Sequence, residues 1–202
     1  MAPPEKIPSH QRRVPRQARS RATMGFILEA AARILREDGR AALTTNLVAE
    51  RAGIGIGTLY GYFPDKEAIL IALARRMIDE DTAALRAALD TDDAEPLRLL
   101  VRTLLNRHRD DSALRREVMS VHLGQGLGPE HARPVAEISA LLARRAPGLL
   151  GRTPPPEQMF VLTRAVLGIA RALAEDGDGA GIPPDRLENE VLRLIRAYLD
   201  SA

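Results

Sequence analysis

The sequence predicts an all-α protein in which a small N-terminal helical domain precedes a larger helical domain. Three observations support this prediction. Apolar residues recur with the three- and four-residue spacing of helices along most of the 202 residues. No run alternates polar and apolar residues with the period of two that marks a half-buried strand. Glycines and prolines stand mainly between the periodic segments, where helices begin or end.

Three helices are expected in the first third of the chain, over residues 22–38, 44–53 and 56–63. Gly39 can adopt the left-handed conformation that ends the first helix. A hydroxyl of Thr44 or Thr45 can accept from the free N–H groups that begin the second. Pro64 ends the third, because proline disfavours helix in the residue before it. Ahead of these helices, residues 1–19 hold four prolines and several arginines without periodicity, which predicts a flexible basic arm.

Beyond residue 65 every periodic segment has the spacing of a helix. Asp65 can cap the first of these helices, and Pro96 suits the first turn of the second. Pro147 and Gly148 are expected to end the fourth, because neither residue favours a helix interior. The six expected helices cover residues 66–90, 96–109, 112–123, 130–145, 157–175 and 184–201.

The charge is unevenly distributed along the chain. Residues 1–66 hold 11 lysines and arginines against 6 acidic residues, a net charge of +5. Residues 67–202 hold 18 against 21, a net charge of −3. Four of the six aromatic residues also lie in the first part. A basic module joined to a mildly acidic remainder favours a part that binds a polyanion, connected to a part with another task.

The composition excludes several classes of protein and site. The chain has no cysteine, so it has no disulfide, thiolate zinc site or cysteine nucleophile. No apolar run approaches the ~20 residues that span a bilayer, and no apolar core follows the polar N-terminus. We therefore expect neither a membrane helix nor a secretory signal, and a cytoplasmic protein. The four histidines lack metal-ligand spacing, and no Ser, His and Asp set marks a catalytic elbow, so we expect no metal, cofactor or enzymatic activity.

Residues 45–63 carry the main functional signal, a short helix, a glycine turn and a second short helix with polar side chains. This arrangement lets the second helix enter a DNA major groove, about 12 Å wide, while the first crosses the backbone. Gly57 and Thr58 are small enough for close approach, and Tyr60 and Tyr62 can reach bases or phosphates with their hydroxyls and rings. The alternative is a pair of ordinary core helices separated by glycines.

The same part of the chain resembles the DNA-binding domain of the TetR family of bacterial transcriptional regulators. The resemblance covers about residues 20–70, and beyond it the chain is similar to the family only in architecture. The stretches that carry it are Ile27-Leu28-Glu29-Ala30-Ala31, Thr44-Thr45, Val48-Ala49-Glu50-Arg51-Ala52-Gly53-Ile54, Gly57-Thr58-Leu59-Tyr60 and Tyr62-Phe63-Pro64-Asp65-Lys66-Glu67.

The resemblance implies a sequence-specific DNA-binding regulator and a role for each matching position. These roles are phosphate contacts for Thr45, Tyr62 and Lys66, base or adjoining backbone contacts for Gly57, Thr58 and Tyr60, and core positions for Leu59 and Phe63. Three positions depart from the family pattern. Gly55 stands where a capping serine is common, Ile56 where lysine is common, and Gly61 where a larger residue is common. Ile56 removes a charge that would face DNA, so we expect an operator of unusual sequence.

The arginines of the N-terminal segment have two open interpretations. Arg19 and Arg21, with Arg12, Arg13 and Arg16, could follow phosphates or enter the minor groove. Equally, they could belong to a solvated tail, as runs of charge usually do.

The resemblance further implies that residues 66–202 bind a small-molecule effector and form a homodimer through the last two helices, with DNA binding left to residues 20–65. Candidate pocket residues, mostly aliphatic, are Leu100, Leu104, His108, Met119, His122, Leu123, Ile138 and Leu142. Candidate dimer residues are Val161, Ala165, Gly168, Ala172, Val191, Ile195 and Tyr198. For both sets the alternative is packing within one chain.

Most regulators of this family repress transcription. We therefore expect a repressor that an effector releases from a palindromic DNA operator. The alternative function is an effector-independent, dimeric DNA-binding architectural protein.

Overall fold

The computed structural model describes residues 16–124, 128–176 and 181–200. It describes the side chains of these residues except those of 16–17, 121–124 and 128–135. The described residues form ten α-helices, which confirms the expected all-α fold. The helices are α1 (Arg16–Glu37), α2 (Gly39–Ala42), α3 (Thr45–Arg51), α4 (Ile56–Tyr60), α5 (Lys66–Leu89), α6 (Pro96–Arg109), α7 (Ser112–Gly124), α8 (Gly128–Leu150), α9 (Pro156–Asp176) and α10 (Pro184–Asp200).

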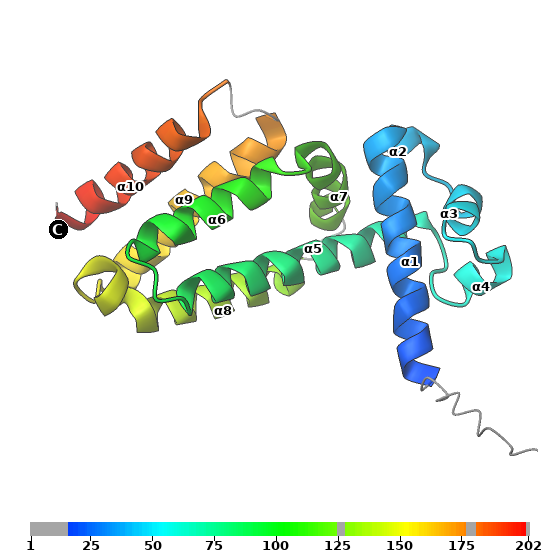
Figure 1. Ribbon diagram of the computed structural model, residues 1–202, viewed down its shortest axis with the longest axis horizontal. Coiled ribbons are helices and arrows are strands. Elements are labelled where there is room, and N and C mark those ends of the chain that lie inside the picture. Colours follow the sequence, from blue (N-terminus) through cyan, green and yellow to red (C-terminus); the bar gives the residue numbers. More distant parts are fainter. Residues whose placement is uncertain (1–15, 125–127, 177–180, 201–202) are drawn as a thin grey trace, which may run out of the picture.

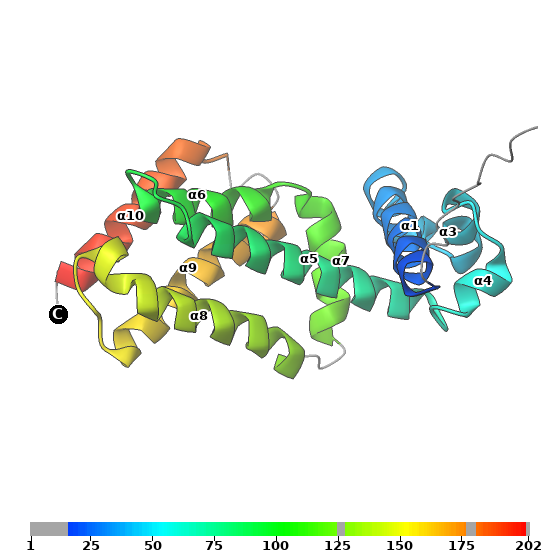
Figure 2. The ribbon, with the colours of Figure 1, turned by 60° about the horizontal axis from the view of Figure 1, so that its bottom comes forward.

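The helices form a small N-terminal group and a larger C-terminal group. In Figure 1, α1 to α4 lie at one end, and α5 runs from them into the body formed by α5 to α10. Figure 2 shows α5, α6 and α8 running along this body, with α7 crossing beside the N-terminal group. No helix in the described part of the chain is long and apolar enough to cross a membrane.

Local sequence signals explain several helix ends. The Thr44 hydroxyl accepts from the backbone N–H of Leu47 at 3.2 Å, and the Asp65 carboxylate accepts from that of Ala68 at 2.7 Å. Both residues are therefore N-caps. Gly39 follows α1 with a φ of 73°, the left-handed conformation expected of a residue that ends a helix.

The short helix α2 was not expected, and three helix boundaries differ from the expectation by three residues or more. Helix α1 begins at Arg16, so the last residues of the expected arm are helical, in keeping with the helix propensity of arginine, glutamine and alanine. Helix α4 ends at Tyr60, because Gly61 follows it and the chain turns there. Helix α8 continues through Pro147 to Leu150, and the left-handed residue that follows is Gly151.

The N-terminal core extends beyond the expected domain boundary at residue 65. Ile27, Ile34 and Leu59 are fully buried in it, and Phe63 is 6% exposed, which confirms the expected core positions of Leu59 and Phe63. The same cluster includes five buried residues of α5, from Ile69 to Met77, and two buried residues of α7. Helix α5 therefore belongs to the N-terminal core over its first half and to the C-terminal body over its second.

A carboxylate ties α10 to α6 in the C-terminal body. Glu188 is only 6% exposed. It accepts from Nη1 of Arg98 at 2.6 Å and from Nε and Nη2 of Arg102 at 2.8 and 3.1 Å. The hydrogen bonds from Arg102 and then those from Arg98 lower the pKa of Glu188. The buried carboxylate is thus compensated by two cations, as a charge inside a protein must be.

Candidate DNA-binding site and ligand cavity

Helices α3 and α4 lie at the outer side of the N-terminal group, away from the body formed by α5 to α10 (Figure 1). Gly53, with a φ of 67°, allows the tight turn between them. The N–H of Thr58 then donates to the Gly55 carbonyl at 2.9 Å and starts α4. Leu59 is buried, whereas the side chain of Tyr60 is 53% exposed. The second helix therefore presents one face to solvent, as entry into a groove requires.

The structure joins two of the predicted DNA-contacting residues. The Tyr60 hydroxyl lies 3.2 Å from the Thr45 hydroxyl, within hydrogen-bonding distance. Either group can donate, and the other then keeps its own O–H for a further acceptor. The pair thus connects the start of α3 to the end of α4 and still offers a donor to a phosphate oxygen.

The other predicted DNA contacts surround this pair. Gly57 and Thr58 are exposed on α4, Tyr62 is half-buried in the turn after α4, and Lys66 is half-buried at the start of α5. A Cβ added at Gly57 would meet no atom within 4 Å, so the fold itself does not require glycine there.

The arginines predicted to contact DNA divide between the described and the undescribed residues. Arg19 and Arg21 are exposed on the first turns of α1. Arg12 and Arg13 lie outside the described residues, as does the side chain of Arg16.

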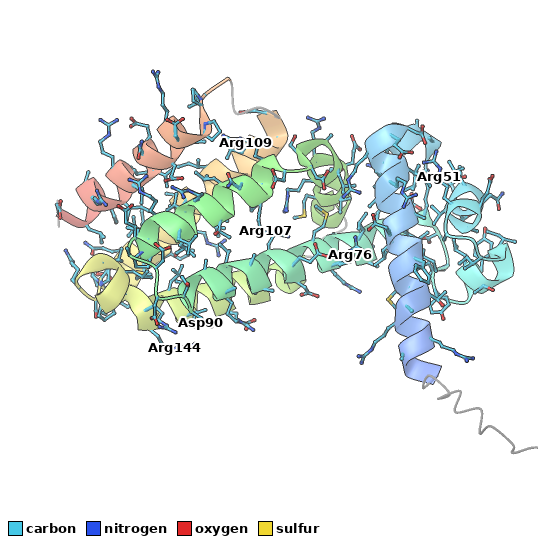
Figure 3. All side chains as sticks on the ribbon, in the orientation of Figure 1. Arg51, Arg76, Asp90, Arg107, Arg109 and Arg144 are labelled. Carbon is cyan, nitrogen blue, oxygen red and sulfur yellow. The ribbon has the colours of Figure 1, made fainter. Side chains whose placement is uncertain are left out.

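Arg51, at the end of α3, forms ion pairs with two acidic side chains of the same protein. Its Nη2 donates to Asp38 at 2.8 Å, and its Nη1 donates to Glu37. Figure 3 shows Arg51 where α3 faces the end of α1. The guanidinium therefore fixes α3 on α1 and is engaged before any phosphate approaches.

A cavity of about 580 Å³ lies within the C-terminal body and is lined by residues of α5 to α10. This volume is in the range of sites for small molecules. Six of the eight predicted pocket residues line it, namely Leu100, Leu104, His108, Met119, Ile138 and Leu142. The side chains of His122 and Leu123 lie outside the described part of the structure. Sequence reasoning missed the walls that α5 and α9 supply, among them Ile78, Leu85, Val166 and Leu167.

A buried ion pair forms the polar wall of the cavity. Arg115, 6% exposed, donates to both oxygens of Asp81 at 2.6 and 3.0 Å. Arg107, labelled in Figure 3, also donates to Asp81. Burial, and then the charge of Arg115, lowers the pKa of His108, which also lines the cavity. The ring is thus neutral at pH 7, and its Nδ1–H donates to the Leu104 carbonyl at 3.0 Å.

The turn between α6 and α7 connects this wall to the DNA-binding helices. Asp111 in that turn accepts from Nε and Nη2 of Arg36 on α1 at 2.9 and 2.8 Å. These hydrogen bonds lower the pKa of Asp111. Asp111 precedes Arg115 by one helical turn, so a movement of α7 would act on both the cavity wall and α1.

The small-residue stripe of α9 is exposed. Val161 is 45% exposed, and Ala165, Gly168 and Ala172 are exposed along the same helix. Neighbouring Phe160 is 62% exposed.

The three residues predicted for the dimer interface on α10 are placed differently. Val191 and Ile195 are 1% and 6% exposed and pack in the core of their own chain, with Tyr198 half-buried against it. They are buried because the wide apolar face of α10 packs on α6 and α9. Among the large apolar side chains of α10, the exposed one is Leu194, at 44%.

The fold and the site together define a helix-turn-helix protein with a ligand-sized cavity in a second helical domain. Comparisons with known proteins agree. The sequence model described as bacterial regulatory proteins, tetR family, matches residues 27–73. An uncharacterized HTH-type transcriptional regulator of Mycobacterium tuberculosis is 29% identical over 175 residues, which are 84% of this chain and 78% of that protein.

Solved structures of other regulators have a similar fold. A regulator of the TetR/AcrR family from Thermobifida fusca is similar with a TM-score of 0.69 at 21% identity, covering 87% of this chain and 97% of that one. The fatty acid degradation regulator FadR from Bacillus halodurans is similar with a TM-score of 0.57 at 18% identity, covering 92% and 97%. Residues 27–73 thus match the model of the tetR family of bacterial regulatory proteins, and the described helices have a fold similar to that of a solved TetR/AcrR-family regulator.

Proposed function

We propose that this protein is a homodimeric repressor that binds a palindromic operator and leaves it when a small apolar molecule enters the cavity. The observation that carries the proposal is the contact between Arg36 of α1 and Asp111, one turn from the cavity-lining Arg115. A protein that only binds DNA has no need of a ligand-sized cavity coupled in this way to its DNA-binding helices.

The proposed DNA-binding surface combines groove and backbone contacts. Gly57, Thr58 and Tyr60 face the bases or the adjoining backbone. Thr45, Tyr62 and Lys66 contact phosphates on either side of α4, and Arg19 and Arg21 extend the contacts along the backbone. The exposure of Tyr60 and its hydroxyl contact with Thr45 support this assignment.

The proposed dimer interface is the exposed apolar face of α9 together with Leu194 of α10. Exposed side chains such as Phe160 and Val161 leave water when two copies meet, and the small residues of the stripe allow the helices to approach closely. Two recognition helices then stand about one turn of DNA, ~34 Å, apart in the state that binds an operator.

The proposed effector is mainly aliphatic, because the described cavity walls hold leucine, isoleucine, valine and methionine and no phenylalanine, tyrosine or tryptophan. The protein leaves the operator if the effector binds more tightly to a second state, in which the two recognition helices are not one turn of DNA apart, than to the operator-binding state. The shift can be no larger than that difference in affinity.

Two measurements on the purified full-length protein test this function. Selection from a pool of random DNA duplexes, followed by sequencing, should enrich a palindromic site. A screen of aliphatic molecules should then find compounds that lower the affinity for that site. An enriched site that no bound compound weakens would support the effector-independent architectural protein, and no enriched site would contradict sequence-specific binding.

A further inference from the structure

Helix α4, the proposed recognition helix, exposes a surface without charged or amide side chains. Its five residues are Ile56, Gly57, Thr58, Leu59 and Tyr60. Leu59 points into the core, and none of the remaining four carries a charge or an amide group. Arginine and lysine recognise guanine, and asparagine and glutamine recognise adenine, through paired hydrogen bonds in the major groove. Helix α4 offers neither kind of contact.

The neighbouring charged and amide groups do not replace them. Arg51 is engaged by Glu37 and Asp38, so its guanidinium already has partners within the protein. Asn46 is exposed, but it lies on α3, the helix that crosses the backbone in this motif. Base recognition by α4 must therefore use the chemistry of its own exposed side chains.

On α4, Ile56 is an apolar residue whose exposure the fold does not explain. Its side chain is 39% exposed and is not among the apolar residues packed against the N-terminal core. It is the first residue of α4, and the N-terminal residues of a recognition helix are those that contact base edges. Because isoleucine is branched at Cβ, the side chain is stiff and loses little freedom on contact.

We propose that Ile56 determines operator specificity by apolar contact with the C5-methyl group of a thymine in each half-site. Thymine is the base that presents a methyl group in the major groove, so an apolar side chain can distinguish it from the other three. The methyl of the exposed Thr58 adds a second surface of the same kind, further along α4. This inference rests on the proposed function, because it requires that α4 enter the major groove.

Deoxyuridine gives a direct test, because it pairs as thymine does but lacks the methyl group. The operator is first selected from random duplexes, and thymines are then replaced one by one, in both half-sites, by deoxyuridine. Burial of one methyl group corresponds to a change in affinity of about fourfold. We expect at least one thymine position at which the wild-type protein loses about this factor per half-site.

The Ile56→Ala variant identifies the side chain responsible. It should bind the thymine operator more weakly than the wild-type protein and should show no further loss at that same position when deoxyuridine replaces thymine. Ile182→Ala serves as the matched control, because Ile182 is a similarly exposed isoleucine, at 43%, next to α10. This control should keep the full deoxyuridine penalty. Thermal melting checks that all three proteins fold equally well.

The outcomes separate the inference from the function on which it rests. A selected operator with no thymine penalty at any position, or with the same penalty in Ile56→Ala as in the wild type, would overturn the role of Ile56 and leave sequence-specific binding intact. Failure to select any operator would instead remove the proposed function. Loss of the penalty in Ile56→Ala alone would establish Ile56 as the residue that reads the thymine.

Discussion

Arg36 and Asp111 join the DNA-binding helices to the cavity-bearing body through two parallel hydrogen bonds of 2.9 and 2.8 Å. A planar guanidinium that meets both oxygens of a carboxylate fixes orientation as well as distance. Asp111 adopts a φ of 55°, a left-handed conformation that aspartate and asparagine tolerate better than most residues. The turn between α6 and α7 is thus shaped to present this carboxylate to α1.

Replacing Asp111 by asparagine should uncouple the cavity from DNA with little loss of stability. Asparagine keeps the backbone conformation but removes the charge, and both partners are over one-third exposed, so the cost should be at most about 1 kcal/mol. With a compound from the screen, the ratio of operator affinities without and with that compound should move towards one. Glu190→Gln, which removes a surface pair with Arg193 on α10, is the control and should keep the wild-type ratio. A ratio unchanged in Asp111→Asn would show that coupling takes another route.

The contribution of Glu188 to stability should depend on pH. Its pKa in the folded protein is lowered from a value of 4.5, so its stabilising effect is complete above that value and is lost as the pH falls through the folded pKa. Glu188→Gln should cost about 1–3 kcal/mol in urea unfolding at pH 7, because Arg98 and Arg102 lose a buried charged partner. As the pH falls below 4.5 and through the lowered pKa of folded Glu188, the two proteins should converge, because Glu188 then becomes neutral. A pH-independent difference would assign the effect to packing.

Tyr60→Ala should weaken operator binding by about 1–3 kcal/mol and hardly change the melting temperature, because the side chain is 53% exposed. Tyr60→Phe separates the ring from the hydroxyl that contacts Thr45. If the hydroxyl binds a phosphate, the phenylalanine variant should lose part of this affinity for all DNA sequences alike. A large fall in melting temperature with operator preference intact would place Tyr60 in the core.

Removal of residues 1–15 should reduce the salt dependence of DNA binding while leaving α1 complete. The deletion removes three cations, Lys6, Arg12 and Arg13. Each phosphate that the shortened protein no longer neutralises makes the slope of log affinity against log salt shallower by about 0.9, so the change should be at most about three units. An identical slope in the shortened protein would mean that these cations do not bind DNA.

Gly168→Arg should separate the dimer without disturbing the chain fold. A Cβ added at Gly168 would meet no atom within 4 Å in one chain, so the chain itself leaves room for a side chain to begin there. An unpaired arginine buried between two chains is costly, and light scattering should report a mass near 22.1 kDa. Ala87→Arg, on an exposed position of α5, should remain dimeric. A dimeric Gly168→Arg would move the interface away from this stripe.

The helix ends that could be predicted depend on local chemistry. The caps at Thr44 and Asp65 and the left-handed Gly39 involve atoms a few residues away, so the sequence is sufficient. The end of α8 is different. Ala146 is buried, and Leu150, which follows Pro147 in the chain, packs on the core formed by α6, α9 and α10. Packing between distant helices thus overrides the weak helix propensity of proline and glycine, and the sequence alone does not show which distant helices will meet.

The two candidate sites differed in how far they could be predicted. The positions on α4 follow from a short motif with fixed spacing. Six of the predicted pocket residues, on α6, α7 and α8, line the cavity, but the sequence does not predict its walls on α5 and α9. Apolar residues such as Ile78 and Leu167 have the same periodicity whether they fill a core or line a cavity. Likewise, the apolar faces of α9 and α10 look alike in sequence, and only the fold shows that Val161 is exposed and Val191 buried.

The 24 residues of α5 run without interruption from one core into the other, and this continuity limits how the protein can be divided. A fragment that stops at residue 65 would lose Ile69, Leu73 and Met77, which are among the residues that α5 packs into the N-terminal core. Even a fragment ending after Met77 would expose the surface that Leu114 and Val118 cover from α7. The recognised family segment ends at residue 73, before these contacts are complete. Grafting this DNA-binding unit onto another sensor would therefore require α5 and a matching α7 to be transferred with it.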